Sequence, residues 1–415
     1  MFVYILNQHG RPLMPCTPRA ARLLLKTGKA TVVKRVPFTL QLLYGSSGYT
    51  QEVSLGIDAG TRRVGVSATR EGLVLFEAEA HLRTDIQELL ARRRQMRRAR
   101  RARKTRYRPC RFLNRKRPKG WLAPSVQHKV DSHLKIMQLV QKILPIRAIT
   151  IEVAQFDLQK IRHPAIAGRE YQQGPQLGFW NAREYVLSRD AHRCQWCHGT
   201  SRDPILNVHH IESRKTGGDS PENLVTLCET CHQHIHRTHQ EHAIKREAGS
   251  LRDATQMGII RWRIYERAKA LFPSVHLTYG YLTKHTRISH NLEKSHLIDA
   301  RCISGRPLAR SDGTWYLLKF VRRNNRQLHK ATIKSGGKRQ SNKAPREVHG
   351  FRLFDCVNYQ GTTCFVFSRR ISGYFALRRL DCTIVHSGAN AKKLHLIQRA
   401  STCLIEPRCG TPPML

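Results

Sequence analysis

Four cysteines in two Cys-x-x-Cys pairs place the strongest constraint on how this chain folds. Cys194 and Cys197 form the first pair, and Cys228 and Cys231 form the second. Thiols at this spacing are typical of a tetrahedral site that binds a structural zinc ion. Four free cysteines in a reducing cytosol are the alternative. The spacing favours a small zinc-bound module within residues 178–245.

Histidines in the same segment predict a second metal ion. His209 and His210 end an apolar run, and neighbouring side chains of a strand point to opposite faces, so these two can have different roles. His232 and His236 are four residues apart and share one face of an expected helix. We therefore expect His209, His232 and His236 to hold one Mg²⁺ ion over a phosphodiester.

Two further residues of this segment have expected roles beside that ion. His210 is the expected general base that deprotonates water, because the pKa of imidazole lies near neutral pH. Asn223 is expected to orient His210 or to brace the loop. The alternative is a zinc ribbon whose histidines merely decorate its surface.

This pattern resembles the HNH, or ββα-metal, endonuclease family over roughly residues 178–245. The resemblance implies that a strand pair and a helix clamp one divalent ion. HNH domains serve restriction, homing and toxin nucleases alike. The resemblance therefore indicates the chemistry but not the biological target.

Acidic residues in three separated segments predict a second nuclease centre. Asp58 ends the apolar strand of SLGIDAGTRRVGVSA, and Glu152 lies in the apolar run of RAITIEVAQFD. In KSHLIDARCIS, His296 and Asp299 are three residues apart on an expected helix and share one face. Asp58, Glu152 and Asp299 would bind two Mg²⁺ ions that stabilise the attacking and leaving oxygens, with His296 assisting proton transfer. Each acid alone fits a capping or surface-paired carboxylate equally well.

The order of these segments resembles a split RuvC-like nuclease of the RNase H fold. That family carries an acid after its first strand, a glutamate in a later strand and a His-x-x-Asp helix. The resemblance implies an α/β fold with a central mixed sheet flanked by helices. The HNH segment would then be inserted between the second and third pieces.

The charge of the chain predicts a large polyanionic partner. The formal net charge is +44 over 415 residues, and a phosphate backbone is the obvious polyanion of this size.

Part of the excess positive charge lies in one arginine-rich block without glycine or proline, which can be helical once its charges are neutralised. A solvated tail or localisation signal is the alternative. The residues expected to bind RNA are Arg92, Arg93, Arg94, Arg97, Arg98, Arg100, Arg101, Arg103, Lys104 and Arg106.

Both ends of the chain add to this pattern. Near the start, Pro-Leu-Met-Pro at residues 12–15 precedes a basic expected helix. Residues 306–415 are first basic and glycine-rich and then form short apolar runs separated by turn residues. These runs predict a small β-barrel.

The order of all these parts resembles the IscB family, which are transposon-associated, RNA-guided DNA endonucleases related to type II CRISPR effectors. The resemblance implies a guide (omega) RNA, a double-stranded DNA target and a short target-adjacent motif. The HNH site would cut the guide-paired strand and the RuvC-like site the displaced strand. The implied parts are a PLMP N-terminal domain (1–50), RuvC-like piece I (51–82), an arginine-rich bridge helix (83–120), piece II (121–177), the HNH nuclease with its zinc site (178–245), piece III (246–305) and an RNA and target-adjacent-motif region (306–415).

Two other functions stay open at this stage, and both lack the guide RNA. A protein-guided HNH endonuclease explains the cysteines and histidines but not the arginine block. A nuclease-inactive nucleic-acid-binding regulator explains the charge but not the intact acids. The sequence has no apolar run of the roughly 18 residues that a membrane span needs. We expect a prokaryotic cytoplasmic protein that acts at the nucleoid, monomeric within its ribonucleoprotein and not bound to membranes.

Overall fold

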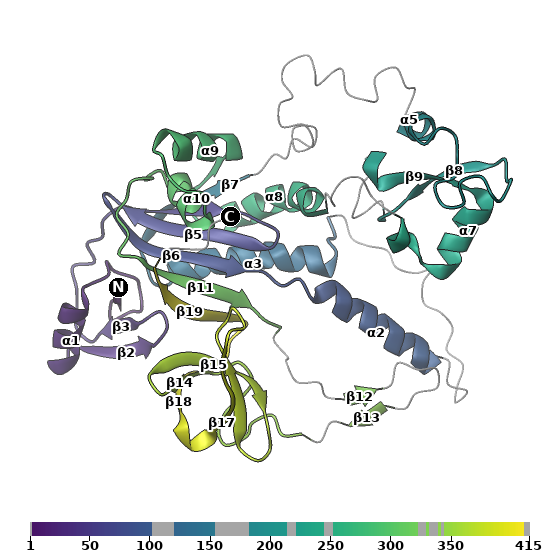
Figure 1. The fold of residues 1–415 in the computed structure, drawn as a ribbon. Coiled ribbons are helices and arrows are strands. Elements are labelled where there is room, and N and C mark those ends of the chain that lie inside the picture. The colour runs from purple at the N-terminus through teal and green to yellow at the C-terminus, as the bar shows by residue number, and fades with distance from the viewer. Residues whose placement is uncertain are drawn as a thin grey trace. The chain divides into compact units, whose positions relative to one another are not determined.

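The computed structural model of the chain contains two compact units (Figure 1). One unit comprises Met1–Val153 together with Trp262–Leu415, and the other comprises Ala154–Arg261, so the second unit interrupts the first in sequence. The structure describes residues 2–101, 120–153, 182–213, 221–244, 252–322, 329–331, 339–341 and 344–410.

A seven-stranded mixed sheet forms the core of the first unit, in the order β10-β7-β4-β5-β6-β11-β19. β4, β5 and β6 pair antiparallel, whereas β7 joins β4, and β10 joins β7, in parallel. The expected mixed α/β architecture is thereby confirmed. The strands are β4 (Val53–Asp58), β5 (Arg63–Arg70), β6 (Leu73–His81), β7 (Ile146–Glu152), β10 (Val275–Thr278), β11 (Thr314–Phe320) and β19 (Cys403–Cys409).

One helix of the first unit lies directly on the sheet, and another, α8, runs in sequence from the second unit into the first. α10 packs against β4 and β5. A Cβ atom on Gly56 of β4 would lie 2.0 Å from the carbonyl oxygen of Ala300, and one on Gly65 of β5 would lie 2.0 Å from that of His296. Glycine is therefore required at both positions for α10 to approach the strands so closely. The helices are α3 (Pro124–Gln141), α8 (Arg252–Leu271), α9 (Gly280–Ser289) and α10 (His296–Ile303).

The region after residue 305 contributes strands to two sheets. β11 pairs in parallel with β6, and β19 pairs antiparallel with β11, so both strands complete the central sheet. The strands between them form a second, antiparallel sheet in the order β17-β16-β15-β14-β18. Its edge strands β17 and β18 are not paired with one another in the described residues, so the expected barrel is an open sheet there. These strands are β14 (Cys356–Tyr359), β15 (Thr362–Arg369), β16 (Tyr374–Arg378), β17 (Ile384–Asn390) and β18 (Leu394–Gln398).

The N-terminal residues form a small sheet of their own, in the order β1-β3-β2. The basic helix expected after the Pro-Leu-Met-Pro segment is α1, which is capped by the side chain of Thr17. The described part of the arginine block, up to Arg101, lies in α2, and the side chains of Arg92, Arg93 and Arg94 are exposed. Arg103, Lys104 and Arg106 lie outside the described residues. The elements are β1 (Tyr4–Leu6), α1 (Pro18–Lys26), β2 (Ala30–Lys34), β3 (Thr39–Leu42), α2 (Ile86–Arg101) and the short pair β12 (His329–Ala331) and β13 (Arg339–Ser341).

The second unit contains two antiparallel strands followed by a helix. β8 and β9 pair so that His209 lies opposite Val225. Apolar side chains of β9 and α7, with three of the paired cysteines, form its core. The elements are α5 (Ala182–Arg189), β8 (Leu206–His210), η2 (Pro221–Asn223), β9 (Leu224–Cys228), α7 (Glu229–Thr238) and η3 (Glu241–Ala243). None of the helices in the described part of the chain combines the length and apolar character needed to cross a membrane.

Gly65→Ala should destabilise the first unit, because the new methyl group would overlap the backbone of His296. Overpacking of this kind typically lowers the free energy of unfolding by about 1–3 kcal/mol. Gly388→Ala is the matched control, since Gly388 also lies in a strand but no described heavy atom lies within 4 Å of its Cβ position. Denaturant unfolding of both variants measures the difference, and equal midpoints would contradict the close approach of α10.

Candidate active sites and zinc site

The four paired cysteines converge at one end of the strand pair in the second unit. Their sulfur atoms all lie within 4.8 Å of one another, and the sulfurs of Cys197 and Cys228 are 3.8 Å apart. Four thiolates bound to zinc at about 2.3 Å in a tetrahedron lie about 3.8 Å from each other. The four thiols are therefore placed to bind a structural zinc ion.

The protonation of one thiol also suits metal binding. Burial raises the pKa of Cys197, but hydrogen bonds with Ser201 outweigh burial and lower the pKa to about 5. Cys197 is therefore a thiolate at neutral pH, which is the form that binds metal. Burial raises the pKa of Cys194, and a zinc ion would offset this by stabilising the charged sulfur.

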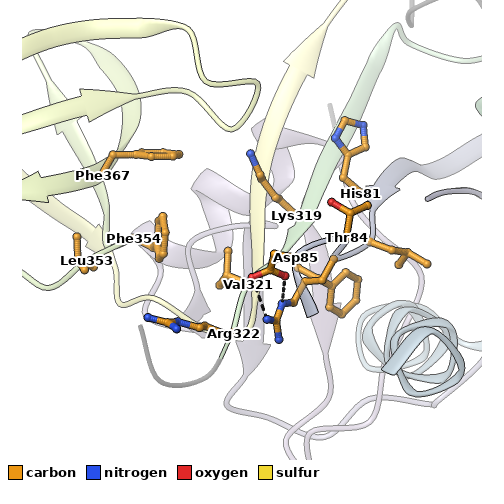
Figure 2. Close-up of a pocket in the computed structure, with 12 residues that line it drawn as sticks. His81, Thr84, Asp85, Lys319, Val321, Arg322, Leu353, Phe354 and Phe367 are labelled. Carbon is orange, nitrogen blue, oxygen red and sulfur yellow. Dashed lines mark hydrogen bonds and ion pairs between the residues drawn. The ribbon is translucent and has the colours of Figure 1, made fainter. Parts of the chain in front are cut away.

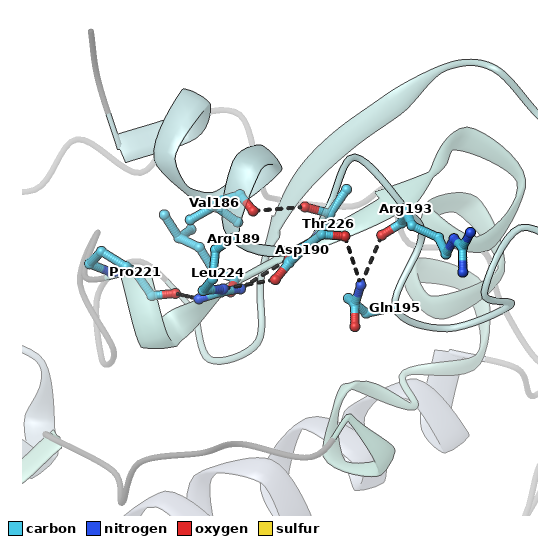
Figure 3. Close-up of polar contacts among 8 residues, drawn as sticks. All are labelled: Val186, Arg189, Asp190, Arg193, Gln195, Pro221, Leu224 and Thr226. Carbon is cyan, nitrogen blue, oxygen red and sulfur yellow. Dashed lines mark hydrogen bonds and ion pairs between the residues drawn. The ribbon is translucent and has the colours of Figure 1, made fainter. Parts of the chain in front are cut away.

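Two neighbouring charged residues at the end of α5 hold the backbone around this site (Figure 3). Arg189 forms an ion pair with Asp190 at 2.7 Å. The Arg189 guanidinium also donates to the backbone oxygens of Pro221, at 2.7 Å, and Leu224, at 3.0 Å. Asp190 accepts a hydrogen bond from the backbone N–H of Thr226 at 2.9 Å. The pair therefore ties α5 to β9, the strand that ends in one of the paired cysteines.

Three imidazoles meet in a second cluster of the same unit. His209 comes from β8, and His232 and His236 come from one face of α7. One nitrogen of each lies within 4.8 Å of the others, and the Nε2 atoms of His232 and His236 are 3.2 Å apart. The Nε2 atom of His209 is buried and has no hydrogen-bond partner within the described part of the chain. This convergence of nitrogen lone pairs is what a metal ion requires.

Burial and the local charges favour the neutral form of His209, which is the form that binds a cation. Burial, together with the nearby His236 and His232, lowers the pKa of His209 to about 4, so its imidazole is neutral at pH 7. Neutral imidazole is the metal-binding form. Nitrogen donors suit a divalent transition metal better than Mg²⁺, which prefers oxygen, so these three donors do not support the expected Mg²⁺. Glu241 lines the same hollow of about 490 Å³ and offers an oxygen donor.

His210 and Asn223 take separate positions beside this cluster. His210 lines the same hollow as the three imidazoles but does not belong to the group of converging nitrogens. The Asn223 side chain is buried and makes two hydrogen bonds, each 2.8 Å, with the backbone N–H and carbonyl of Glu212. Asn223 therefore braces the loop that follows His210.

The expected acidic centre is assembled in the first unit, where β4, β7 and α10 meet. Asp58 ends β4, Glu152 ends β7, and α10 carries His296 and Asp299. The Nδ1 atom of His296 lies 2.5 Å from a carboxylate oxygen of Asp58. Residues separated by most of the chain are thus brought into direct contact.

Each acid in this centre affects the charge of its neighbours. Burial first, and then the charge of Asp58, raise the pKa of Glu152 to about 7 and that of Asp299 to about 6. Burial lowers the pKa of His296, but the hydrogen bond and charge of Asp58 outweigh it, so the pKa is raised. A divalent cation would relieve the repulsion between the carboxylates.

The spacing of these acids differs from that of the thiols and imidazoles. No three of the four side chains bring their ligand atoms within 4.8 Å of one another in the described structure. A wider arrangement is compatible with two ions about 3.5–4 Å apart. The oxygen donors also fit Mg²⁺, so the carboxylates could hold the two expected ions.

The sequence reasoning missed two residues that hold these acids. Thr283 on α9 donates a hydrogen bond to Glu152 at 2.5 Å, and Arg287 on the same helix pairs with Asp299 at 3.2 Å. Neither belongs to a motif that spacing alone would detect. The glycines of β4 and β5 signal only the close approach of α10, because a glycine inside a strand often marks the approach of another backbone.

A basic and aromatic cleft of about 400 Å³ lies elsewhere in the first unit (Figure 2). Lys319 and Arg322 line it together with Phe354 and Phe367, whose rings meet edge to face at 5.3 Å. Cations beside aromatic faces are suited to contact with a nucleic-acid strand. No sequence motif had indicated this cleft, because its lining residues come from several separated segments.

Two family models match the chain. The model described as RRXRR protein matches residues 3–174, and the model described as HNH endonuclease matches residues 194–238. These matches fit an IscB-type protein. The HNH match supports a nuclease that uses a divalent metal ion.

One solved structure similar to this chain is that of Streptococcus thermophilus Cas9 in complex with the GGAA PAM. The two share 15% identity with a TM-score of 0.31. The match covers 50% of this chain and 30% of the Cas9 chain, so it spans less than a third of the length of that chain. No curated protein matches the chain.

Cys228→Ser should remove zinc and unfold the second unit locally. The free energy of zinc binding, roughly 10 kcal/mol or more in small zinc modules, is part of their folding free energy. Cys409→Ser is the control, because Cys409 is an exposed free cysteine outside the cluster. Elemental analysis and limited proteolysis of both purified variants test this. Full zinc content in Cys228→Ser would show that the four thiols do not form the zinc site.

Proposed function

We propose that this chain is an RNA-guided DNA endonuclease with two separate cleavage centres. A structured omega RNA would be bound by the arginine-rich helix α2 and would pair its guide with one DNA strand. The histidine centre would cut that paired strand, and the RuvC-like carboxylate centre would cut the displaced strand. The observation that carries the proposal is that one strongly basic chain contains a cluster of three converging imidazoles and, separately, a centre in which His296 contacts Asp58.

The histidine centre supports hydrolysis by general-base catalysis. A divalent ion held by His209, His232 and His236 would stabilise the negative charge that develops on the scissile phosphate. His210 lines the same hollow and would accept the proton of the attacking water. Asn223 would keep the following loop in place and thereby limit how far His210 can move.

In the carboxylate centre, the acids and the histidine would have different roles from those in the histidine centre. Asp58, Glu152 and Asp299 would hold the ions that stabilise the attacking and leaving oxygens. The hydrogen bond and charge of Asp58 raise the pKa of His296, and Asp58 fixes the orientation of this imidazole through Nδ1. His296 would then assist proton transfer during cleavage.

The charge of the chain supports a nucleic-acid guide. With 73 basic and 29 acidic residues, the excess of positive charge is larger than two catalytic centres alone need. Pairing between guide and target would read the sequence, while the protein would contact backbone phosphates and a short adjacent motif. The region from residue 306 onward, including the cleft beside Lys319, is where we place part of these contacts.

The decisive experiment is to express the chain with its flanking genomic DNA and to sequence the RNA that is purified with it. One structured RNA that ends in a variable guide would support the proposal and would supply the target for a cleavage assay. Only heterogeneous RNA, removable by salt, would instead support a protein-guided HNH endonuclease. Intact DNA in the presence of Mg²⁺ or Mn²⁺ would point to a nuclease-inactive regulator.

The two centres should be separable by substitution. Asp58→Ala should stop cleavage of the displaced strand, and His210→Ala should slow cleavage of the paired strand by about 10²–10⁴-fold, the usual contribution of a general base. Each variant should retain the other cut. His234→Ala is the control, because His234 lies on α7 outside the converging nitrogens. Strand-specific labels measure both rates, and loss of both cuts from one substitution in an assembled complex would rule out independent centres.

A further inference from the structure

Two exposed tyrosines flank the start of α9 in the first unit. Tyr279 immediately precedes the helix, and Tyr281 lies in its first turn. They are 38% and 69% exposed, and Leu282 beside them is 44% exposed. The two tyrosine rings are nearly parallel, with an interplanar angle of 12° and centroids 6.0 Å apart. The start of α9 thus exposes a large apolar surface to solvent.

The glycine between the two tyrosines lies against the carboxylate centre. A Cβ atom on Gly280 would be 3.1 Å from a carboxylate oxygen of Glu152. One residue beyond the aromatic segment, Thr283 donates a hydrogen bond of 2.5 Å to the other oxygen of Glu152. The first turn of α9 therefore carries the exposed rings and also contacts a catalytic acid.

The charge around these rings fits a polyanion. α9 contains no acidic residue and carries the exposed Lys284, whereas its Arg287 is already paired with Asp299. Lys294, in the loop between α9 and α10, is exposed and acts electrostatically on Asp299. A polyanionic strand that reaches the carboxylates would therefore pass cations on the segment that also bears the tyrosines.

The chemistry of such a strand explains the aromatic rings. An unpaired base has a planar face that stacks on tyrosine, whereas a paired base in a duplex is already stacked on its neighbours. Stacking is tolerant of sequence, because every base has such a face. Rings held beside a cleavage centre would fix a nucleotide next to the phosphodiester that is to be cut.

We propose that Tyr279 and Tyr281 form a stacking platform for a base of the single DNA strand that enters the carboxylate centre. This inference rests on the proposed function, in which that centre cuts the displaced strand. The tyrosines are positioning residues for the strand. They would place the phosphodiester in the centre and would take no part in breaking its bond.

The test uses the full chain with its guide RNA and a DNA target whose two strands carry different labels. Tyr281→Ala and the double variant with Tyr279→Ala should slow cutting of the displaced strand by about tenfold, the value of one lost base stack. Cutting of the paired strand should be unchanged, which confirms that the complex is folded and assembled. Tyr281→Phe keeps the ring and should retain the wild-type rate. Tyr49→Ala, at an exposed tyrosine in a distant part of the sequence, is the matched control.

A second readout separates stacking from a merely structural effect. Single abasic sites are introduced in turn near the cut in the displaced strand. In the wild type, one position should slow cutting by about tenfold, because the stacked base is missing there. In Tyr281→Ala the same abasic site should have no further effect, since the stack is already lost.

Four results would overturn the platform. Wild-type rates in the double variant, or an abasic profile that is the same with and without the tyrosines, would show that no base stacks on them. Loss of co-purified RNA in the tyrosine variants would assign the rings to RNA instead of the DNA strand. A wild-type complex that leaves the displaced strand intact would overturn the proposed function of this centre and the platform with it.

Discussion

The close contact between α10 and the strands β4 and β5 is the feature on which the first unit depends. The backbone of α10 lies so close to the strands that there is no room for a side chain at Gly56 or Gly65. It places His296 against Asp58, although 238 positions separate them in sequence. The chain between these residues can therefore contain a second compact unit, provided that α10 returns to the same position on the sheet.

Three clusters of like groups occur in the described structure, and each is suited to a different ion. The four thiols fit zinc and the three imidazoles fit a divalent transition metal, whereas the three carboxylates are more widely spaced and offer the oxygen donors that Mg²⁺ prefers. In the carboxylate cluster, the pKa of Glu152 rises to about 7 because burial and a neighbouring acid disfavour its charged form. In the imidazole cluster, the pKa of His209 falls to about 4 because burial and neighbouring histidines disfavour the cation. A bound cation would favour the deprotonated form of both groups, so it would offset the raised pKa of Glu152 and would bind the imidazole of His209 in the neutral form that it already has.

Local spacing allowed much of these clusters to be predicted from the sequence. The cysteine pairs and the histidines one helical turn apart are short-range patterns, and strand ends with acids indicated the second centre. Long-range pairing was not predictable in the same way. β19 joins the central sheet through β11, and nothing in the short apolar runs after residue 306 distinguishes this strand from those of the second sheet. Thr283 and Arg287 were missed because their roles depend on how α9 packs against α10.

The most direct test of the account is an anomalous-difference map from crystals of the guide complex that contain Zn²⁺ and Mn²⁺. We expect a zinc peak among the four thiols, a separate peak among His209, His232 and His236, and Mn²⁺ bound by Asp58, Glu152 and Asp299. A map with α10 in place on the sheet but without any ion at these three carboxylates would contradict the claim that this contact builds a metal-dependent cleavage centre.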